Sequence, residues 1–189
     1  MQNERGFSLL ELIIAMSIFA ILVVMAIPAF GKWVANSRVR SVAETLQNGL
    51  NLSKAEAVRL NRSVQFSLTN GSPDATLTAT AVANGTNWMI VAQALLAGDS
   101  ATFVEGGQLG NLAPNVAISS TDSSGTAFAT LAFTALGRVQ STAGITFPVT
   151  YAVSTTNSDR PLNVMVSAGS EVRLCDPNKS IANSPDGCK

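Results

Sequence analysis

The chain has 189 residues, of which 47% are hydrophobic and 13% charged, and its formal net charge at pH 7 is zero. This length predicts a single domain. The sequence contains no histidine, which excludes Ser-His-Asp and Cys-His catalysis and histidine-bound zinc. Its two cysteines are too few for a four-cysteine metal site. We therefore expect neither an enzyme with catalytic residues nor a bound cofactor or metal.

An apolar run opens the chain. From Phe7 to Phe30 there are 24 residues with a single charge, Glu11, and a membrane-spanning helix needs roughly 20 apolar residues. The alternative is a cleaved secretory signal peptide, which has a shorter apolar core of about 7–15 residues and an A-x-A-like cleavage site. The stretch from Pro28 to Trp33 lacks such a site. We expect the segment to remain on the protein as a membrane anchor.

Glu11 is the unusual residue of this run. A carboxylate within a membrane span costs about 2.5–3.5 kcal/mol on insertion scales, which makes it a candidate functional residue. If the mature chain began at Phe7, a free amine would lie within about 6 Å of Glu11 along the helix axis. An amine can neutralise a carboxylate in a medium of low dielectric constant, and a helix N-terminus also favours an anion.

The stretch GFSLLE from Gly6 to Glu11 resembles the class III signal of type IV pilins and type II secretion pseudopilins. The resemblance implies that a prepilin peptidase cuts between Gly6 and Phe7 on the cytoplasmic side and N-methylates Phe7. It also implies that Glu11 meets the Phe7 amine of a neighbouring subunit during assembly. The alternative is an ordinary single-span anchor with a coincidental glutamate.

The apolar run continues into an amphipathic pattern. Apolar residues at 39, 42, 43, 46 and 50 follow one helical face, Ala55 and Val58 are expected to extend it, and the pattern ends near Asn61. The sequence thus predicts one helix from Phe7 to about Leu60, roughly 80 Å long. Pro28 is expected to bend it, because proline removes a helical hydrogen bond.

The second part of the predicted helix is basic. Residues 32–62 contain six basic and two acidic side chains. A nucleic-acid or lipid-headgroup face is one interpretation. We favour a solvated helix face that also contacts neighbouring subunits, because exposed helices are commonly charged.

Residues after Arg62 alternate in the manner of short strands separated by turn residues. Gly106–Gly110 lacks the Lys-Ser/Thr of a phosphate-binding loop and is predicted to be a flexible turn. An α+β fold is expected, in which one face of an antiparallel sheet or β-sandwich receives the apolar face of the helix. The predicted strands are Ser63–Thr69, Thr76–Val82, Asn87–Ala92, Asn115–Ser119, Phe128–Phe133, Thr146–Val153, Leu162–Ser167 and Glu171–Leu174, the last two forming a hairpin.

Cys175 and Cys188 bracket a polar loop near the C-terminus. If the anchor leaves this end outside the cytoplasm, the compartment is oxidising and the two residues should form a disulfide. A loop of about 14 residues would then contribute roughly 3 kcal/mol of stability. Two reduced, buried thiols are the alternative, which the polar, proline-containing loop does not favour.

The head resembles the GspH/FimT/FimU family of minor pilins and pseudopilins. The similar segments are Phe133–Val139 (FTALGRV), Val172–Pro177 (VRLCDP) and Lys54–Val58 (KAEAV). The resemblance implies a type IV pilin-like fold, a long N-terminal helix packed on an antiparallel β-sheet or β-sandwich head. The expected parts are a leader (1–6), a membrane-spanning and filament-core half of the helix (7–30), its amphipathic continuation (31–61) and a β-rich head with a C-terminal disulfide loop (62–189).

Three roles within this family remain open: a FimU-like minor pilin that primes and caps a type IV pilus, a GspH-type pseudopilin, and a FimT-type DNA-uptake receptor. FimT-type receptors use a basic G-R-x-R motif, whereas this chain has Gln140 in place of the second arginine after Arg138. The head from Ser63 onward carries five basic and eight acidic residues, and DNA affinity depends on several cationic contacts to phosphates. Arg138 and Arg173 are the candidate DNA contacts, although we expect them to pair with acids or loop carbonyls.

We therefore expect a structural assembly protein of the type IV pilus tip. Its implied partners are other minor and major pilins or pseudopilins, the prepilin peptidase and an inner-membrane assembly platform, and nucleic acid is not favoured. The implied location is the bacterial inner membrane, crossed once with the head in the periplasm, and later the tip of a pilus or pseudopilus.

Overall fold

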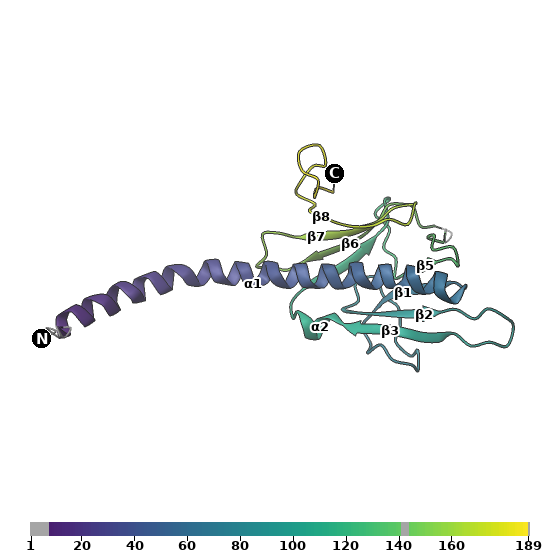
Figure 1. Cartoon of the computed structure of the whole chain (residues 1–189), viewed down its shortest axis with the longest axis horizontal. Coiled ribbons are helices and arrows are strands. Elements are labelled where there is room, and N and C mark those ends of the chain that lie inside the picture. Colours follow the sequence, from purple (N-terminus) through teal and green to yellow (C-terminus); the bar gives the residue numbers. More distant parts are fainter. Residues whose placement is uncertain (1–7, 141–143, 189) are drawn as a thin grey trace, which may run out of the picture.

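A single long helix runs from the N-terminal end of the chain into the head (Figure 1). In this computed structural model, which describes residues 8–140 and 144–188, helix α1 spans Leu9–Leu60. The Ser8 hydroxyl caps its start by accepting a hydrogen bond from the Glu11 amide at 3.2 Å. Asn61, in the left-handed conformation with φ of 49°, ends it. These ends confirm the predicted helix, while the predicted cleavage and methylation site at Gly6 and Phe7 lies outside the described residues.

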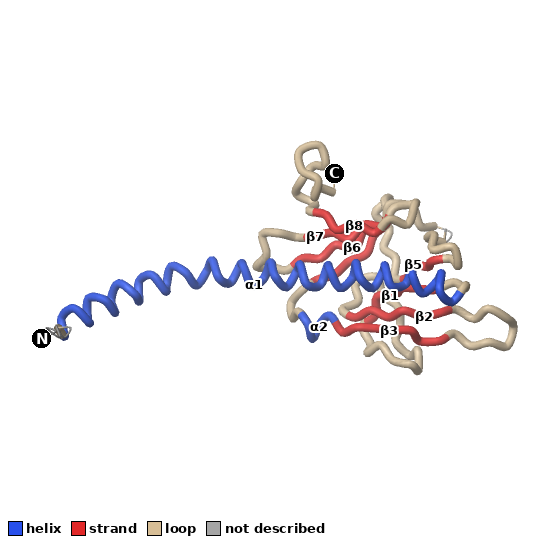
Figure 2. The backbone as a smooth tube through the Cα atoms, viewed as in Figure 1, coloured by secondary structure: helices blue, strands red, loops and turns tan. Residues whose placement is uncertain are grey.

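Within the described residues, eight antiparallel strands form two sheets of four, and in the view of Figure 2 β2 and β3 lie on one side of the helix and β7 and β8 on the other. The first sheet has the order β3-β2-β1-β5 and the second β4-β6-β7-β8. The strands are β1 (Val64–Thr69), β2 (Asn87–Ala92), β3 (Thr102–Gln108), β4 (Ala117–Thr121), β5 (Thr130–Phe133), β6 (Val149–Ser154), β7 (Leu162–Val166) and β8 (Val172–Cys175), with a short helix α2 (Leu109–Leu112) after β3.

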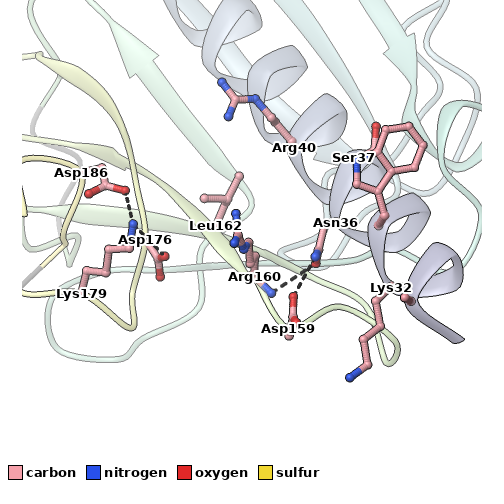
Figure 3. Close-up of a pocket in the computed structure, with 12 residues that line it drawn as sticks. Lys32, Asn36, Ser37, Arg40, Asp159, Arg160, Leu162, Asp176, Lys179 and Asp186 are labelled. Atoms are coloured by element: carbon pink, nitrogen blue, oxygen red, sulfur yellow. Dashed lines mark hydrogen bonds and ion pairs between the residues drawn. The ribbon is translucent and has the colours of Figure 1, made fainter. Parts of the chain in front are cut away.

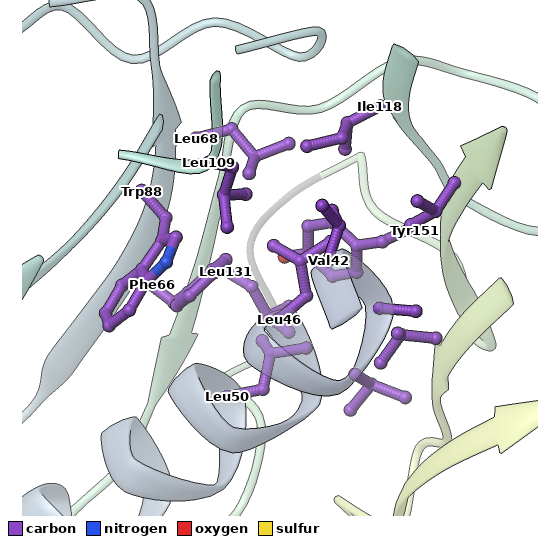
Figure 4. Close-up of a cluster of buried hydrophobic side chains, with 14 of the residues drawn as sticks. Val42, Leu46, Leu50, Phe66, Leu68, Trp88, Leu109, Ile118, Leu131 and Tyr151 are labelled. Carbon is purple, nitrogen blue, oxygen red and sulfur yellow. The ribbon is translucent and has the colours of Figure 1, made fainter. Parts of the chain in front are cut away.

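The core lies where the second half of α1 meets both sheets. Leu46 and Leu50 of α1 are fully buried, as are Phe66 of β1 and Tyr151 of β6 (Figure 4). The Tyr151 ring meets that of Phe66 edge-on, with ring centroids 5.8 Å apart. Burial of this size of apolar and aromatic surface is the main stabilising contribution to the head. The predicted α+β fold, a long helix packed on antiparallel sheets, is confirmed.

Small residues let α1 approach the first sheet closely near its C-terminal end. A Cβ atom on Gly49 would lie 2.9 Å from Cε2 of Phe66, so no side chain fits there. Ser53 and Ala57 continue this buried line one turn and two turns later. The expectation that Ala55 and Val58 extend the apolar face was wrong. Both are exposed, Val58 by 54%, because the helix turns the small residues toward the sheet instead.

One strand prediction was wrong for a local reason. Thr76–Val82 forms turns and loop with one isolated bridge, between Ala81 and Thr69. The Asp74 carboxylate binds the Thr76 amide at 2.9 Å, and Leu77 has a φ of 55°, which interrupts an extended chain.

Strand β3 was not predicted at all. Gly106 and Gly107, expected in a flexible turn, are strand residues, and a Cβ on Gly107 would lie 2.7 Å from Nε1 of Trp88. The glycines permit this close packing.

The remaining strands agree with the predictions to within a few residues. Strand β2 has the predicted bounds, and β7 and β8 form the predicted hairpin. Strand β4 begins two residues later than predicted, since Asn115 has a φ of 69°. Strand β6 begins after Pro148, whose nitrogen has no hydrogen to donate. Pro28 lies inside α1, which follows a gradual curve in Figure 1, and a bend caused by Pro28 stays a prediction.

Candidate functional site

The first half of α1 extends beyond the head and is not covered by it (Figure 1). An 18-residue window there has a mean hydropathy of 2.8, and none of it is buried. By length and composition this helix is able to cross a membrane. The large apolar side chains from Leu9 to Phe30 are exposed, so water is a poor environment for this half of the helix. Lipid or neighbouring apolar helices would cover it.

Glu11 lies in the first turn of this uncovered half. Its side chain forms no ion pair within the described residues, whereas the Ser17 hydroxyl is satisfied by the Ile13 carbonyl at 2.8 Å. The position of Glu11 three residues after the Ser8 cap is also the spacing of a capping box. The cap at Ser8 was not anticipated, although the Ser-x-x-Glu spacing signals it.

Two of the three segments that resemble the pilin family, Lys54–Val58 and Phe133–Val139, meet at one junction. A Cβ on Gly137, which has a φ of 70°, would lie 3.0 Å from Cγ2 of Val58. The buried Ser170 contacts both of these segments. Its hydroxyl accepts a hydrogen bond from the Val139 amide at 2.6 Å, and its carbonyl accepts one from the Lys54 ammonium at 3.0 Å. The junction seats the end of α1 between the β5 turn and the β7–β8 turn.

The two candidate DNA-contacting arginines do not lie in one cationic site. Arg173 is half-buried, and its guanidinium donates a hydrogen bond to the Gly187 carbonyl in the disulfide loop. This agrees with the expectation that it satisfies a loop carbonyl. Arg138 is exposed on the turn after β5 and forms no ion pair among the residues described.

The C-terminal loop is closed as predicted by a disulfide between Cys175 and Cys188, whose Cα atoms are 5.1 Å apart. Lys179 crosses the loop to reach Asp186, with 2.5 Å between its Nζ and Oδ2. Hydrogen bonds from Lys179 and then Ser184 lower the pKa of Asp186 to about 2. Covalent and ionic links therefore hold the loop together at its base and within its span.

A cleft of about 720 Å³ lies where α1 leaves the head (Figure 3). One wall is the α1 segment from Ala29 to Arg40, and the others are the loop after β6 and the disulfide loop. Asn36 joins the helix to the first loop, because its amide donates to Asp159 Oδ1 at 2.7 Å and its oxygen accepts from the Ser158 hydroxyl at 2.6 Å. The cleft combines cationic and anionic side chains with the exposed ring of Trp33.

Two of the basic residues on α1 are paired along the helix surface. Arg40 contacts Glu44 at 2.8 Å and Arg59 contacts Glu56 at 2.6 Å, both with exposed arginines. Such pairs contribute little to stability. They agree with a solvated helix face, the interpretation favoured from the sequence.

No group of three or more His, Cys, Asp or Glu side chains able to hold a metal occurs in the described ranges. The buried Asp122 is instead a structural carboxylate. It accepts hydrogen bonds from Ser124, Thr126 and Thr146. The hydrogen bond from Ser124 is the largest cause that lowers the pKa of Asp122 below its ordinary value. Asp122 thus joins the β4–β5 loop to the segment before β6.

Comparison with known proteins identifies the protein family of this chain. The prokaryotic N-terminal methylation motif matches residues 1–27, a range that includes the start of α1. The family of type II transport protein GspH matches residues 42–179. The chain belongs to this family, whose members are structural pilins and pseudopilins that assemble with one another.

Solved structures share the fold at low sequence identity. The type IV minor pilin FimU of Pseudomonas aeruginosa is 19% identical, with a TM-score of 0.51 over 81% of this chain and 96% of that one. The minor pseudopilin EpsH of the Vibrio cholerae type II secretion system is 13% identical, with a TM-score of 0.52 over 77% of this chain and 98% of that one. At these identities the likeness establishes the fold. No match was found among curated proteins.

Proposed function

We propose that the protein is a minor pilin, a structural subunit of the tip or priming complex of a type IV pilus, assembled through its N-terminal helix. The observation that carries the proposal is the uncovered apolar half of α1, which has Glu11 in its first turn and most of which lies within the matched methylation motif. A subunit of this shape buries its apolar half among neighbouring helices and displays its head outside the filament core. The role is structural, with no catalytic chemistry.

Maturation precedes assembly in this proposal. The prepilin peptidase cleaves between Gly6 and Phe7 and N-methylates Phe7. In the polymer, the Glu11 carboxylate then neutralises the Phe7 amine of a neighbouring subunit, since both charges are costly in an apolar core unless they are paired. Mass spectrometry of the protein from cells with active peptidase should find an N-methylated Phe7 terminus. An intact Met1 there contradicts the proposal.

The protein is anchored in the bacterial inner membrane by one span, with the head in the periplasm, before the assembly platform extracts it into the filament. The Cys175–Cys188 disulfide supports this orientation, because disulfides persist in oxidising compartments. Modification by a membrane-impermeant reagent, applied to a chain with a cysteine in place of exposed Ser72 and the native pair oxidised, should label the head from the periplasmic side. Labelling only after the membrane is broken contradicts this orientation.

A GspH-type pseudopilin of a type II secretion system is the second candidate. The matching family model and the likeness to EpsH favour it. A deletion of the gene separates the two roles. Loss of surface pili with normal secretion supports the pilus, and loss of secretion with normal piliation supports the secretion system.

DNA binding in the manner of FimT is the third candidate and has less support. Arg173 is engaged by the Gly187 carbonyl, and the acidic head is a poor surface for phosphates. A gel shift with the full chain in detergent, repeated at rising salt, tests this candidate. A salt-sensitive shift that Arg138→Ala abolishes would favour DNA binding over a purely structural role.

A further inference from the structure

The cleft at the base of the head lies at the depth of the lipid headgroups, if the protein is anchored as proposed above. The uncovered apolar segment from Leu9 to Phe30 is about 33 Å long at about 1.5 Å per residue, and the hydrocarbon core of a bilayer is about 30 Å thick. Lys32 and Trp33 follow directly. The loop after β6 lies beside this point, since Thr156–Asp159 and the helix segment Ile27–Lys32 line a second, adjoining hollow.

Two of the cations in the cleft are already paired with acids. Arg40 contacts Glu44 at 2.8 Å, and Lys179 contacts Asp186 at 2.5 Å. Lys32 and Arg160, in contrast, form no ion pair within 4.0 Å in the described part of the chain. These two cations are therefore available to an anionic ligand.

One carboxylate accompanies them. Asp159 is fixed by the Asn36 amide at 2.7 Å. That hydrogen bond, and the nearby charges of Lys32 and Arg160, hold the pKa of Asp159 below its ordinary value, so the group is ionised at neutral pH. Only one of its oxygens, Oδ1, accepts a hydrogen bond from the described residues. The second oxygen is free to accept from a cationic donor.

An aromatic ring completes the site. Trp33 is 64% exposed and borders the cleft, with its ring centroid 5.7 Å from that of Phe30. Tryptophan is enriched at the membrane–water interface, where its ring lies among the headgroups. Such a ring positions the cleft at the lipid surface.

From this arrangement we infer that the cleft binds the headgroup of a phospholipid that carries both a phosphate and a primary amine, as phosphatidylethanolamine does. The phosphate contacts Lys32 and Arg160, and the ammonium donates hydrogen bonds to Asp159. A quaternary ammonium headgroup has no hydrogen to donate to this carboxylate, and a glycerol headgroup has no cation. The cleft therefore selects the primary amine over both. The bound lipid would hold the head at the membrane until the subunit is extracted.

The test uses the full chain in nanodiscs with equal amounts of phosphatidylethanolamine, phosphatidylglycerol and phosphatidylcholine. Native mass spectrometry after release from the disc counts the lipids retained on the protein. We expect phosphatidylethanolamine to be retained about tenfold over phosphatidylcholine, the factor that one charge-assisted hydrogen bond supplies. Lys32→Ala and Arg160→Ala should each reduce total lipid retention several-fold. The matched control Arg38→Ala removes an exposed cation of the same helix that does not line the cleft, and it should leave retention unchanged.

Asp159→Asn gives the sharpest readout. Asparagine still accepts from Asn36 but lacks the charge, so retention should persist while the preference for phosphatidylethanolamine over phosphatidylglycerol disappears. Equal retention of the three lipids by the wild type, or a preference that survives Asp159→Asn, overturns the inference. Strong retention of phosphatidylglycerol alone would indicate a simple anion site and also overturns it. A wild-type chain that does not enter nanodiscs at all contradicts the proposed anchoring instead.

Discussion

The two halves of helix α1 differ in what covers them. From Val39 to Ala57 one face of the helix is buried against two sheets, whereas from Leu9 to Phe30 large apolar side chains are exposed around the helix. The backbone is continuous across the two halves. The difference shows that the head covers only part of α1, and that the apolar remainder needs another apolar environment, for which we propose lipid and then neighbouring subunits. Substitutions in one half should therefore leave the other unaffected.

The largest effect on assembly is expected from Glu11→Gln in the uncovered half. Removing one partner of a buried charge pair costs about 2 kcal/mol or more, so incorporation into filaments should fall roughly thirtyfold. Immunoblots of sheared filaments against whole cells measure it, and the unfolding midpoint of the head should not change. Glu44→Gln, on the other half of the same helix, is the matched control. Wild-type incorporation of Glu11→Gln contradicts the docking role.

The second effect concerns the stability of the head and the disulfide loop at its edge. Replacing Cys175 and Cys188 together by serine opens a loop of about 14 residues and should lower the free energy of unfolding by roughly 3 kcal/mol. Urea unfolding followed by circular dichroism measures this change. Membrane association through Leu9–Phe30 should be retained. An unchanged unfolding midpoint would mean that the loop adds no stability to the head.

Gly49→Val tests the contact between the buried half and the first sheet. The new side chain would enter the space held by the Phe66 ring, 2.9 Å from the position of its Cβ. Overpacking of this kind costs about 1–3 kcal/mol, measurable as a lower thermal midpoint of the head. Gly31→Ala is the control, since no atom outside its own helix lies within 4 Å of that Cβ. Equal midpoints for Gly49→Val and the wild type would contradict close packing.

The smallest effect near neutral pH is expected at Asp122, far from the apolar half. Its pKa is lower in the folded than in the unfolded chain, so its contribution to stability is present above about pH 4 and is lost as the pH falls through the folded pKa. Urea unfolding of the wild type from pH 7 to pH 3 should show this loss. Asp122→Asn should flatten the acid slope, and Asp99→Asn, on an exposed loop, should not. A slope unchanged in Asp122→Asn contradicts the assignment.

Strong periodic signals made most of the fold predictable. The single charge among 24 residues and the repeat from Val39 to Leu50 were enough to place α1, and alternation placed β1 and β2. The edge strand β3 escaped prediction because Gly106 and Gly107 resemble turn residues. In the strand, Gly107 lies against the Trp88 ring and Gly106 against Pro73, which are contacts between segments that no local pattern reveals.

The candidate sites also differ in whether the sequence could predict them. The disulfide followed from compartment and loop chemistry. For Arg173 the sequence left acids and loop carbonyls open as partners, and the fold supplies the Gly187 carbonyl. The basal cleft could not be predicted, because Asn36 and Asp159 are far apart in sequence and are brought together only by the fold. The role of Glu11 depends on another subunit and stays a prediction.

The junction at Ser170 has a consequence for relatives of this chain. Lys54, Gly137 and Val139 belong to the segments that mark the family, and they meet where α1 ends against the head. These family segments therefore describe a structural contact between α1 and the head, common to subunits of pili and subunits of secretion systems. The choice of neighbours must then be encoded elsewhere, for example in the exposed leucines at 95 and 96 between β2 and β3, and exchanging that loop between relatives should exchange their neighbours.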